Sequence, residues 1–215
     1  MERVTFYVDG FNFYYGLKTI KRINPIWKKA YWIDLVKFFE QFLGKGQVLE
    51  QVIYFTASPL SKDKSSRQSA FLNANKLING DRFEVVRGKY LSKTFNCPNC
   101  KYAITKPEEK KTDVNISVRM IADCINDKTD KLVLVSGDSD LVPPIEFILK
   151  QYKEKEIKVY FPPAINSSNL SNLMRYNKSK TVQIEKNFNK IQNSIMPDIV
   201  SANGKSYSIP DKWKL

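Results

Sequence analysis

Aspartates from three separate parts of the chain are the residues best suited to chemistry. Asp9 follows a short apolar run, Asp113 follows a lysine-rich segment, and Asp138 and Asp140 follow a second apolar run. Carboxylates held close together repel one another unless a cation lies among them, and Mg²⁺ or Mn²⁺ takes oxygen ligands of this kind. A metal held there can activate water and neutralise the charge of a phosphodiester under attack.

The absence of histidine from the chain restricts the catalytic alternatives. A Ser-His-Asp or Cys-His system is excluded, as is a nuclease whose general base is a histidine. A phosphatase of the haloacid dehalogenase type needs a second aspartate two residues after Asp9, where this chain has Phe11. Any one of these aspartates alone is more typical of a turn or a helix N-cap, so the joint pattern carries the functional interpretation.

The charge of the chain favours a polyanionic partner. There are 35 lysines and arginines against 22 acidic residues, a formal net charge of +13. Binding a nucleic acid releases counterions from its phosphates, whereas the alternative interpretation is a surface of solvated lysines. Lys21, Arg22, Lys28 and Lys29 are interleaved with aromatic residues, a composition that suits single-stranded RNA. The alternative there is a loop around a partly buried Trp27.

The elements that must position the aspartates alternate between strands and helices. Strands are predicted for Arg3–Asp9, Val48–Ala57, Arg82–Arg87, Lys131–Val135, Ile157–Phe161 and Thr181–Ile184. Helices are predicted for Tyr31–Leu43, Asp63–Asn79, Asp113–Asn126, Leu141–Lys153 and Ser168–Tyr176. This alternation predicts a Rossmann-like, three-layer α/β/α domain with a mostly parallel sheet. Ligands bind beyond the carboxyl ends of such strands, where Asp9 and Asp138 should meet.

Domain organisation follows from where this rhythm breaks. We expect one domain over residues 1–186, a loop-like insertion at about 89–109, and a polar, irregular extension over 187–215 that Tyr207 and Trp213 hold against the domain. In the helix Asp113–Asn126, the expected buried stripe is Val114, Val118, Ile121 and Ile125. The chain shows no signal peptide pattern and no membrane-length apolar run, so we expect a cytoplasmic location.

The three cysteines leave a zinc site open. Cys97-Pro98-Asn99-Cys100 supplies half of the four ligands that a structural zinc site needs, and Cys124 is expected on the buried side of its helix. Two chains in a homodimer could complete a four-cysteine site, and a metal-free turn is the alternative. An odd, low cysteine count argues against a secreted disulfide scaffold.

Three segments, in order, resemble the motifs of the NYN domain family within the PIN-like nuclease superfamily. Phe6–Gly16 resembles the first motif, Glu109–Asn115 the second and Leu134–Leu141 the third. The bacterial LabA-like, or DUF88, group is the most similar branch. The resemblance spans about Val4–Ile184, and the end of the tail from Met196 to Trp213 is similar to the ending of that group.

The resemblance implies a PIN-like fold and Mg²⁺- or Mn²⁺-dependent cleavage of RNA. It implies that Asp9, Asp113 and Asp138 bind the metal, with Asp140 as a fourth acid. Asn12 would contact a metal-bound water or the phosphate. Lys110, Ser136 and Ser139 are the expected substrate contacts at the site. The alternative function is a PIN-like RNA-binding module that has lost catalysis.

Overall fold

Six parallel strands form the central sheet of the protein. The computed structural model describes the backbone of residues 1–214 and the side chains of residues 1–89, 94–103 and 110–214. The strand order is β3-β2-β1-β6-β7-β8. The bounds are β1 (Glu2–Asp9), β2 (Gln47–Thr56), β3 (Phe83–Arg87), β6 (Lys131–Val135), β7 (Glu156–Phe161) and β8 (Val182–Gln183). The predicted α/β fold with a parallel sheet is therefore confirmed.

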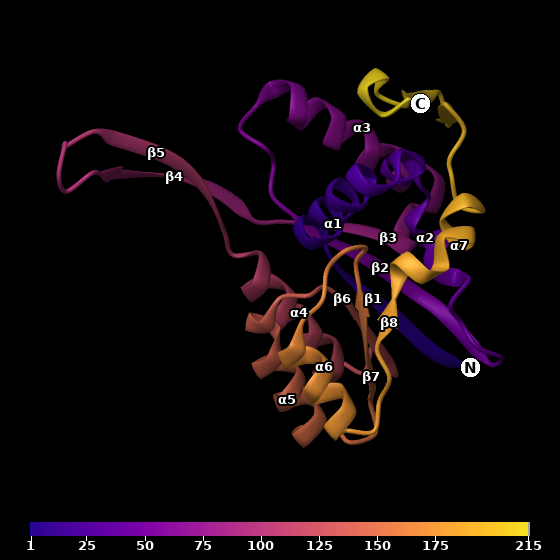
Figure 1. Ribbon diagram of the computed structural model, residues 1–215. Coiled ribbons are helices and arrows are strands. Elements are labelled where there is room, and N and C mark those ends of the chain that lie inside the picture. The colour runs from indigo at the N-terminus through magenta and orange to yellow at the C-terminus, as the bar shows by residue number, and fades with distance from the viewer. Residues whose placement is uncertain (215) are drawn as a thin grey trace.

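Helices cover both faces of this sheet (Figure 1). One face carries α1 (Gly10–Ile23), the 3-10 helix η1 (Pro25–Trp32), α2 (Leu35–Glu40), α3 (Lys62–Asn79) and α7 (Phe188–Gln192). The other face carries α4 (Thr112–Ile125), α5 (Val142–Gln151) and α6 (Ser168–Tyr176). Side chains alternate along a strand. Phe6 and Val8 of β1 therefore pack in the core under α1, α2 and α3, and Tyr7 packs in the core under α4, α5 and α6. Short 3-10 turns complete the elements: η2 (Gly80–Arg82), η3 (Ser139–Leu141), η4 (Ile184–Asn187) and η5 (Asp211–Trp213).

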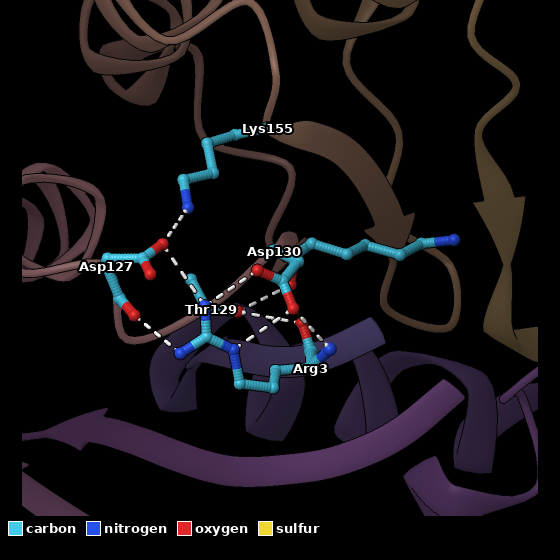
Figure 2. A network of polar contacts seen from close by, with 6 residues as sticks. Arg3, Asp127, Thr129, Asp130 and Lys155 are labelled. Carbon is cyan, nitrogen blue, oxygen red and sulfur yellow. Dashed lines mark hydrogen bonds and ion pairs between the residues drawn. The ribbon is translucent and has the colours of Figure 1, made fainter. Parts of the chain in front are cut away.

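Arg3 fixes the amino end of β1 against the loop that leads into β6. Its guanidinium donates to both carboxylate oxygens of Asp130, at 3.0 and 2.7 Å, and to the carbonyl of Asp127 at 2.6 Å. Lys155 pairs with the same Asp127, so one network joins three segments (Figure 2). The network sets the register of β1 beside β6 at the sheet edge opposite the aspartate-bearing ends.

The N-terminal half contains one helix that was not predicted and one that differs from its prediction. The helix α1 was not predicted, although Asp9 caps it and its buried Gly16 packs against the carbonyl of Pro163. Glycines lower helix propensity, which hides a helix that tertiary packing stabilises. The predicted helix Tyr31–Leu43 is interrupted, because Ile33 forms a β-bridge with Ile195 before the short helix α2 begins.

The expected orientation of α4 was also wrong. Val114, Val118 and Ile125 are 63%, 61% and 63% exposed, whereas Ile116, Met120 and Cys124 are buried. Both sets follow helical spacing, so the helix carries two apolar stripes and the sequence pattern alone cannot select the buried one. The expectation that Cys124 faces the core is correct.

The segment expected to be a loop at 89–109 is instead an antiparallel hairpin. Strand β4 (Lys89–Asn96) pairs with β5 (Ala103–Lys110), and the hairpin projects away from the rest of the molecule (Figure 1). Its strands do not need the apolar alternation of a sheet packed on a core, which is why the sequence pattern missed them.

The tail has more regular structure than expected. Strands β9 (Ile199–Ala202) and β10 (Lys205–Ser208) form a hairpin that contacts α3. The ring of Trp213 then stacks on Tyr31 with centroids 5.5 Å apart. Among the described residues, no helix has the length and apolar character required to cross a membrane.

Candidate metal and active site

The structure brings Asp9, Asp113 and Asp138 together at the carboxyl edge of the sheet. Asp9 ends β1, Asp138 follows the adjacent strand β6, and Asp113 lies in the first turn of α4. One carboxylate oxygen from each lies within 4.8 Å of the other two. Opposite ligands of an octahedral Mg²⁺ lie about 4.2 Å apart, twice a ligand distance of about 2.1 Å, so the cluster fits a hard divalent cation after small side-chain movement.

Burial sets the electrostatics of Asp9. Its side chain is 2% exposed, and this burial raises the pKa of its carboxyl group above the ordinary value. Hydrogen bonds from the Asn12 backbone and the Ser136 hydroxyl oppose that shift, and the nearby charge of Asp138 adds to it. A cation between these carboxylates would remove their mutual repulsion.

Both oxygens of Asp9 already accept hydrogen bonds. Oδ1 accepts from the backbone N–H groups of Phe11 and Asn12 at 3.1 and 3.0 Å. Oδ2 accepts from Asn12 Nδ2 at 2.6 Å and from the Ser136 hydroxyl at 2.7 Å. A carboxylate offers about four acceptor positions. Direct coordination by Asp9 therefore requires one donor to turn away, and the Ser136 hydroxyl can do so by rotating.

Asn12 and Ser136 hold the two central loops together. Asn12 Oδ1 accepts from the Gly137 N–H at 3.1 Å, and Ser136 Oγ accepts from the Asp138 N–H at 3.1 Å. The polar groups of Asn12 and Ser136 thus position Asp9 and Asp138. The family resemblance implies another role for these two residues, which is contact with a metal-bound water or with the substrate. A side chain at Gly137 would collide with Ile165, so the loop needs glycine at this point.

The other residues expected at the site surround the three acids. Ser139 and Asp140 are exposed in η3, where the Asp140 N–H donates to Asp138 at 3.0 Å. Asp140 lies outside the three-acid cluster. Lys110 is exposed at the end of β5, two residues before α4 begins. Asp113 and Asp140 are not helix N-caps, since Lys111 is the N-cap of α4 and Leu141 that of α5, whereas Asp9 caps α1 and Asp138 caps η3 while both belong to the cluster.

The basic cluster lies at a distance from the acids. Lys21 and Arg22 are in the last turn of α1, about 18 Å from Asp9 at 1.5 Å per helical residue, and Lys28 and Lys29 are in η1. Lys21 lies over the ring of Tyr31. Trp27, which the alternative interpretation places partly buried in a loop, is 5% exposed and belongs to the core. This cluster could contact an RNA strand at a point several nucleotides away from the nucleotide at the acids.

The cysteine pair lies at the tip of the projecting hairpin. A tight turn forms there, with N–H of Cys97 donating to the Tyr102 carbonyl and N–H of Lys101 donating to the Cys97 carbonyl, both at 2.9 Å. Hydrogen bonds from the backbones of Cys100 and Asn99 lower the pKa of the Cys97 thiol. Among the described side chains, no third Cys, Asp or Glu joins them as a metal ligand, so zinc binding and a homodimer stay predictions.

The fold and the acidic cluster define an α/β domain of nuclease-like type. The chain matches the NYN domain over residues 3–179 and belongs to the NYN domain family. The resemblance drawn from the three motifs is therefore confirmed, and the LabA-like branch stays a prediction.

Two known proteins are similar to the chain. The 6-hydroxy-3-succinoylpyridine 3-monooxygenase HspA of Pseudomonas putida is 27% identical, over 74% of this chain and 59% of that protein. The chain thus spans less than two thirds of that relative. The crystal structure of VPA0982, a protein of unknown function from Vibrio parahaemolyticus, matches with a TM-score of 0.53 at 20% identity, covering 85% of this chain and 93% of that one. At this identity the likeness concerns the fold alone.

Mn²⁺ binding should depend on the two strand-end acids. We expect the double variant Asp9→Asn and Asp138→Asn to lose Mn²⁺ binding in calorimetry, because two of the three carboxylate ligands become neutral amides. Asp81→Asn is the matched control, since Asp81 is a fully exposed aspartate on another part of the surface. Unchanged Mn²⁺ affinity in the double variant would show that Mn²⁺ binds elsewhere.

Proposed function

We propose that the protein is a metal-dependent endoribonuclease that hydrolyses RNA phosphodiester bonds at the three-acid cluster. The observation that carries this proposal is the convergence of Asp9, Asp113 and Asp138 at the carboxyl edge of the sheet in a chain of net charge +13. The basic surface attracts the polyanionic RNA. The three carboxylates alone would repel a phosphate, and a cation bound among them removes this repulsion. A bound Mg²⁺ or Mn²⁺ would supply an activated water and neutralise charge on the phosphate.

The residues of the chain hold the site in place for that reaction. Ser136 and Asn12 donate to Asp9 and connect it to the loop that carries Asp138. Lys110, exposed just before α4, would contact a phosphate group of the strand. Since the chain contains no histidine, there is no histidine pair to promote attack by the 2′-hydroxyl of the RNA. Hydrolysis should therefore leave a 5′-phosphate and a 3′-hydroxyl.

The alternative is a catalytically inactive module that binds RNA. The basic cluster, whose Lys21 lies about 18 Å along α1 from Asp9, would serve binding in either case. The test incubates labelled single-stranded RNA and DNA with Mn²⁺, with Mg²⁺ or with EDTA and maps the ends of the products. Metal-dependent cleavage with 5′-phosphate ends supports the nuclease. A 2′,3′-cyclic phosphate rejects the mechanism, and binding without cleavage favours the inactive module.

RNA affinity should fall steeply as the salt concentration rises, because the basic cluster binds phosphates of the RNA. We expect charge reversal of Lys21, Arg22, Lys28 and Lys29 to weaken binding of every RNA sequence, since phosphate contacts carry no sequence information. The slope of log affinity against log salt should decrease by about 0.7 for each phosphate of a single strand that the variant no longer neutralises. Fluorescence anisotropy at several salt concentrations measures both quantities, and an unchanged slope would place the binding surface elsewhere.

A further inference from the structure

A cavity of about 440 Å³ lies beside the three-acid cluster. It is enclosed by α1, η1, α3 and the η5 turn of the tail, and this size is typical of small-ligand sites. Gly10 and Phe11, which directly follow Asp9, line one end of it. Sequence reasoning missed this cavity, because its walls come from segments as far apart as Tyr14 and Trp213.

Aromatic rings form much of the cavity wall. Tyr31 lies between Tyr14 and Trp213, with centroid distances of 5.6 and 5.5 Å, and its ring is nearly parallel to that of Trp213 at 19°. Tyr15 and Phe71 extend the wall on either side. Bases of single-stranded RNA stack on aromatic faces of this kind.

The charge at the cavity suits a phosphate. Lys18, Lys64 and Arg67 line it, and the described lining residues include no aspartate or glutamate. Asp63 lies outside the wall, where it pairs with Arg67 and also with Lys212 at 2.9 Å. That second pair joins α3 to the tail next to Trp213.

Gln68 presents an unused acceptor within this lining. Its Nε2 donates to Thr56 Oγ1 at 2.9 Å and to the Ala57 carbonyl at 3.2 Å. A carbonyl only accepts, so this contact fixes the orientation of the amide. Oε1 is then buried without a hydrogen-bond partner among the described residues. Buried acceptors are normally satisfied, and Oε1 is closed to solvent in this conformation, so an N–H or O–H group of a ligand reaches it when the Gln68 side chain turns toward the cavity.

We propose that the cavity binds one nucleotide of the RNA strand next to the bond that is cut. Its base packs against Tyr14, Tyr15 and Trp213 and donates to Gln68 Oε1 after that side chain turns, while its phosphate pairs with Lys64 and Arg67. The inference rests on the proposed function, and it adds to that function the position of the RNA strand relative to the three acids. Gly10 and Phe11 in the lining directly follow Asp9, and Lys21 lies over the ring of Tyr31, another lining residue, at 5.5 Å from its centroid, so one strand can contact the acids, the cavity and Lys21.

The test combines a protein variant with an abasic RNA in the full-length chain with EDTA, so that no RNA is cut. We expect Trp213→Ala to weaken RNA binding about 10-fold, because loss of the stacking of one base typically costs about 5-fold to 150-fold. Removing a single base at one position beside the cleavage site should cost about the same. The two losses should not add, since both remove the same contact. Gln68→Leu should also weaken binding, and Trp213→Phe should keep affinity by retaining an aromatic face.

Controls and readouts separate this inference from the proposed function. Trp27 and Trp32 are buried, so RNA should quench the emission of Trp213, and Trp213→Phe should lack that quench. Tyr176→Ala removes an 87% exposed aromatic side chain on α6 and should leave affinity unchanged. Additive losses from Trp213→Ala and the abasic RNA, in a protein that still binds RNA, would overturn the subsite. The subsite would also be overturned if adenosine, cytidine, guanosine or uridine 5′-monophosphate bound as tightly as the RNA strand. Failure to bind any RNA would overturn the proposed function itself.

Discussion

Asp113→Asn should lower the rate of RNA cleavage by on the order of 100-fold or more while RNA affinity is retained. The asparagine side chain has the same shape, so the change removes one charged ligand atom from a cluster whose members lie within 4.8 Å. Loss of a negative charge cannot weaken attraction to phosphate except through the lost metal. Single-turnover cleavage with saturating enzyme in Mn²⁺ measures the rate, and anisotropy in EDTA measures the affinity.

The control for this result must change charge by the same amount away from the site. Asp81→Asn does so at a fully exposed position, and we expect it to cleave RNA at the rate of the unaltered protein. Asp113 also lies in the first turn of α4, where an acid stabilises the helix dipole by about 0.3 to 1 kcal/mol. A thermal melt of both variants accounts for that contribution. Cleavage by Asp113→Asn at the unaltered rate would remove Asp113 from the mechanism.

Arg119→Ala should destabilise the protein by about 3 to 5 kcal/mol, because it leaves a buried charge unpaired. Arg119 donates to both oxygens of Asp123 at 3.0 and 2.9 Å and to both oxygens of Glu84 at 2.9 Å. Asp123 is 3% exposed and also accepts from the Tyr7 hydroxyl at 2.9 Å. Burial, with the charge of Asp123 next, raises the pKa of Tyr7, so the tyrosine stays protonated and keeps donating.

Thermal unfolding measures this loss, which corresponds to a decrease in Tm of roughly 6 to 20 °C for a domain of this size. The double variant Arg119→Ala with Asp123→Asn should recover part of it, since the buried charge is then absent. Arg175→Ala, on the exposed side of α6, should change the free energy of unfolding by no more than about 0.5 kcal/mol. A decrease for Arg119→Ala as small as for Arg175→Ala would contradict the role assigned to this network.

The positions of the acids could be predicted from the sequence better than the rest of the site. Asp9 and Asp138 each follow an apolar strand, and parallel neighbours place their carboxyl ends together. Asp113 opens the helix that the apolar pattern of residues 113–126 predicts, and its motif indicates the same place. That pattern indicated Val114 and Val118 as buried, whereas packing on the sheet buries Ile116 and Met120 instead.

The cavity was not predictable, for a physical reason. Its wall joins Tyr14 of α1, Arg67 of α3 and Trp213 of the tail, and no local periodicity links residues that meet only after the tail has packed. The helix α1 itself was hidden by the low propensity of Gly10 and Gly16. Gly10 is required there because a side chain would come within 2.6 Å of the Phe55 carbonyl.

The place of β1 in the middle of the sheet also determines when the three-acid cluster can assemble during synthesis. One of its neighbours, β2, follows soon after it in the chain, but the other, β6, begins only at Lys131. A nascent chain that has emerged as far as α4 carries Asp9 and Asp113 without Asp138 and without the strand that positions it. Pairing of β1 with β6 is a long-range contact that closes a loop of more than one hundred residues, so it forms late. In the proposed nuclease, the metal site is therefore complete only after most of the domain has been made.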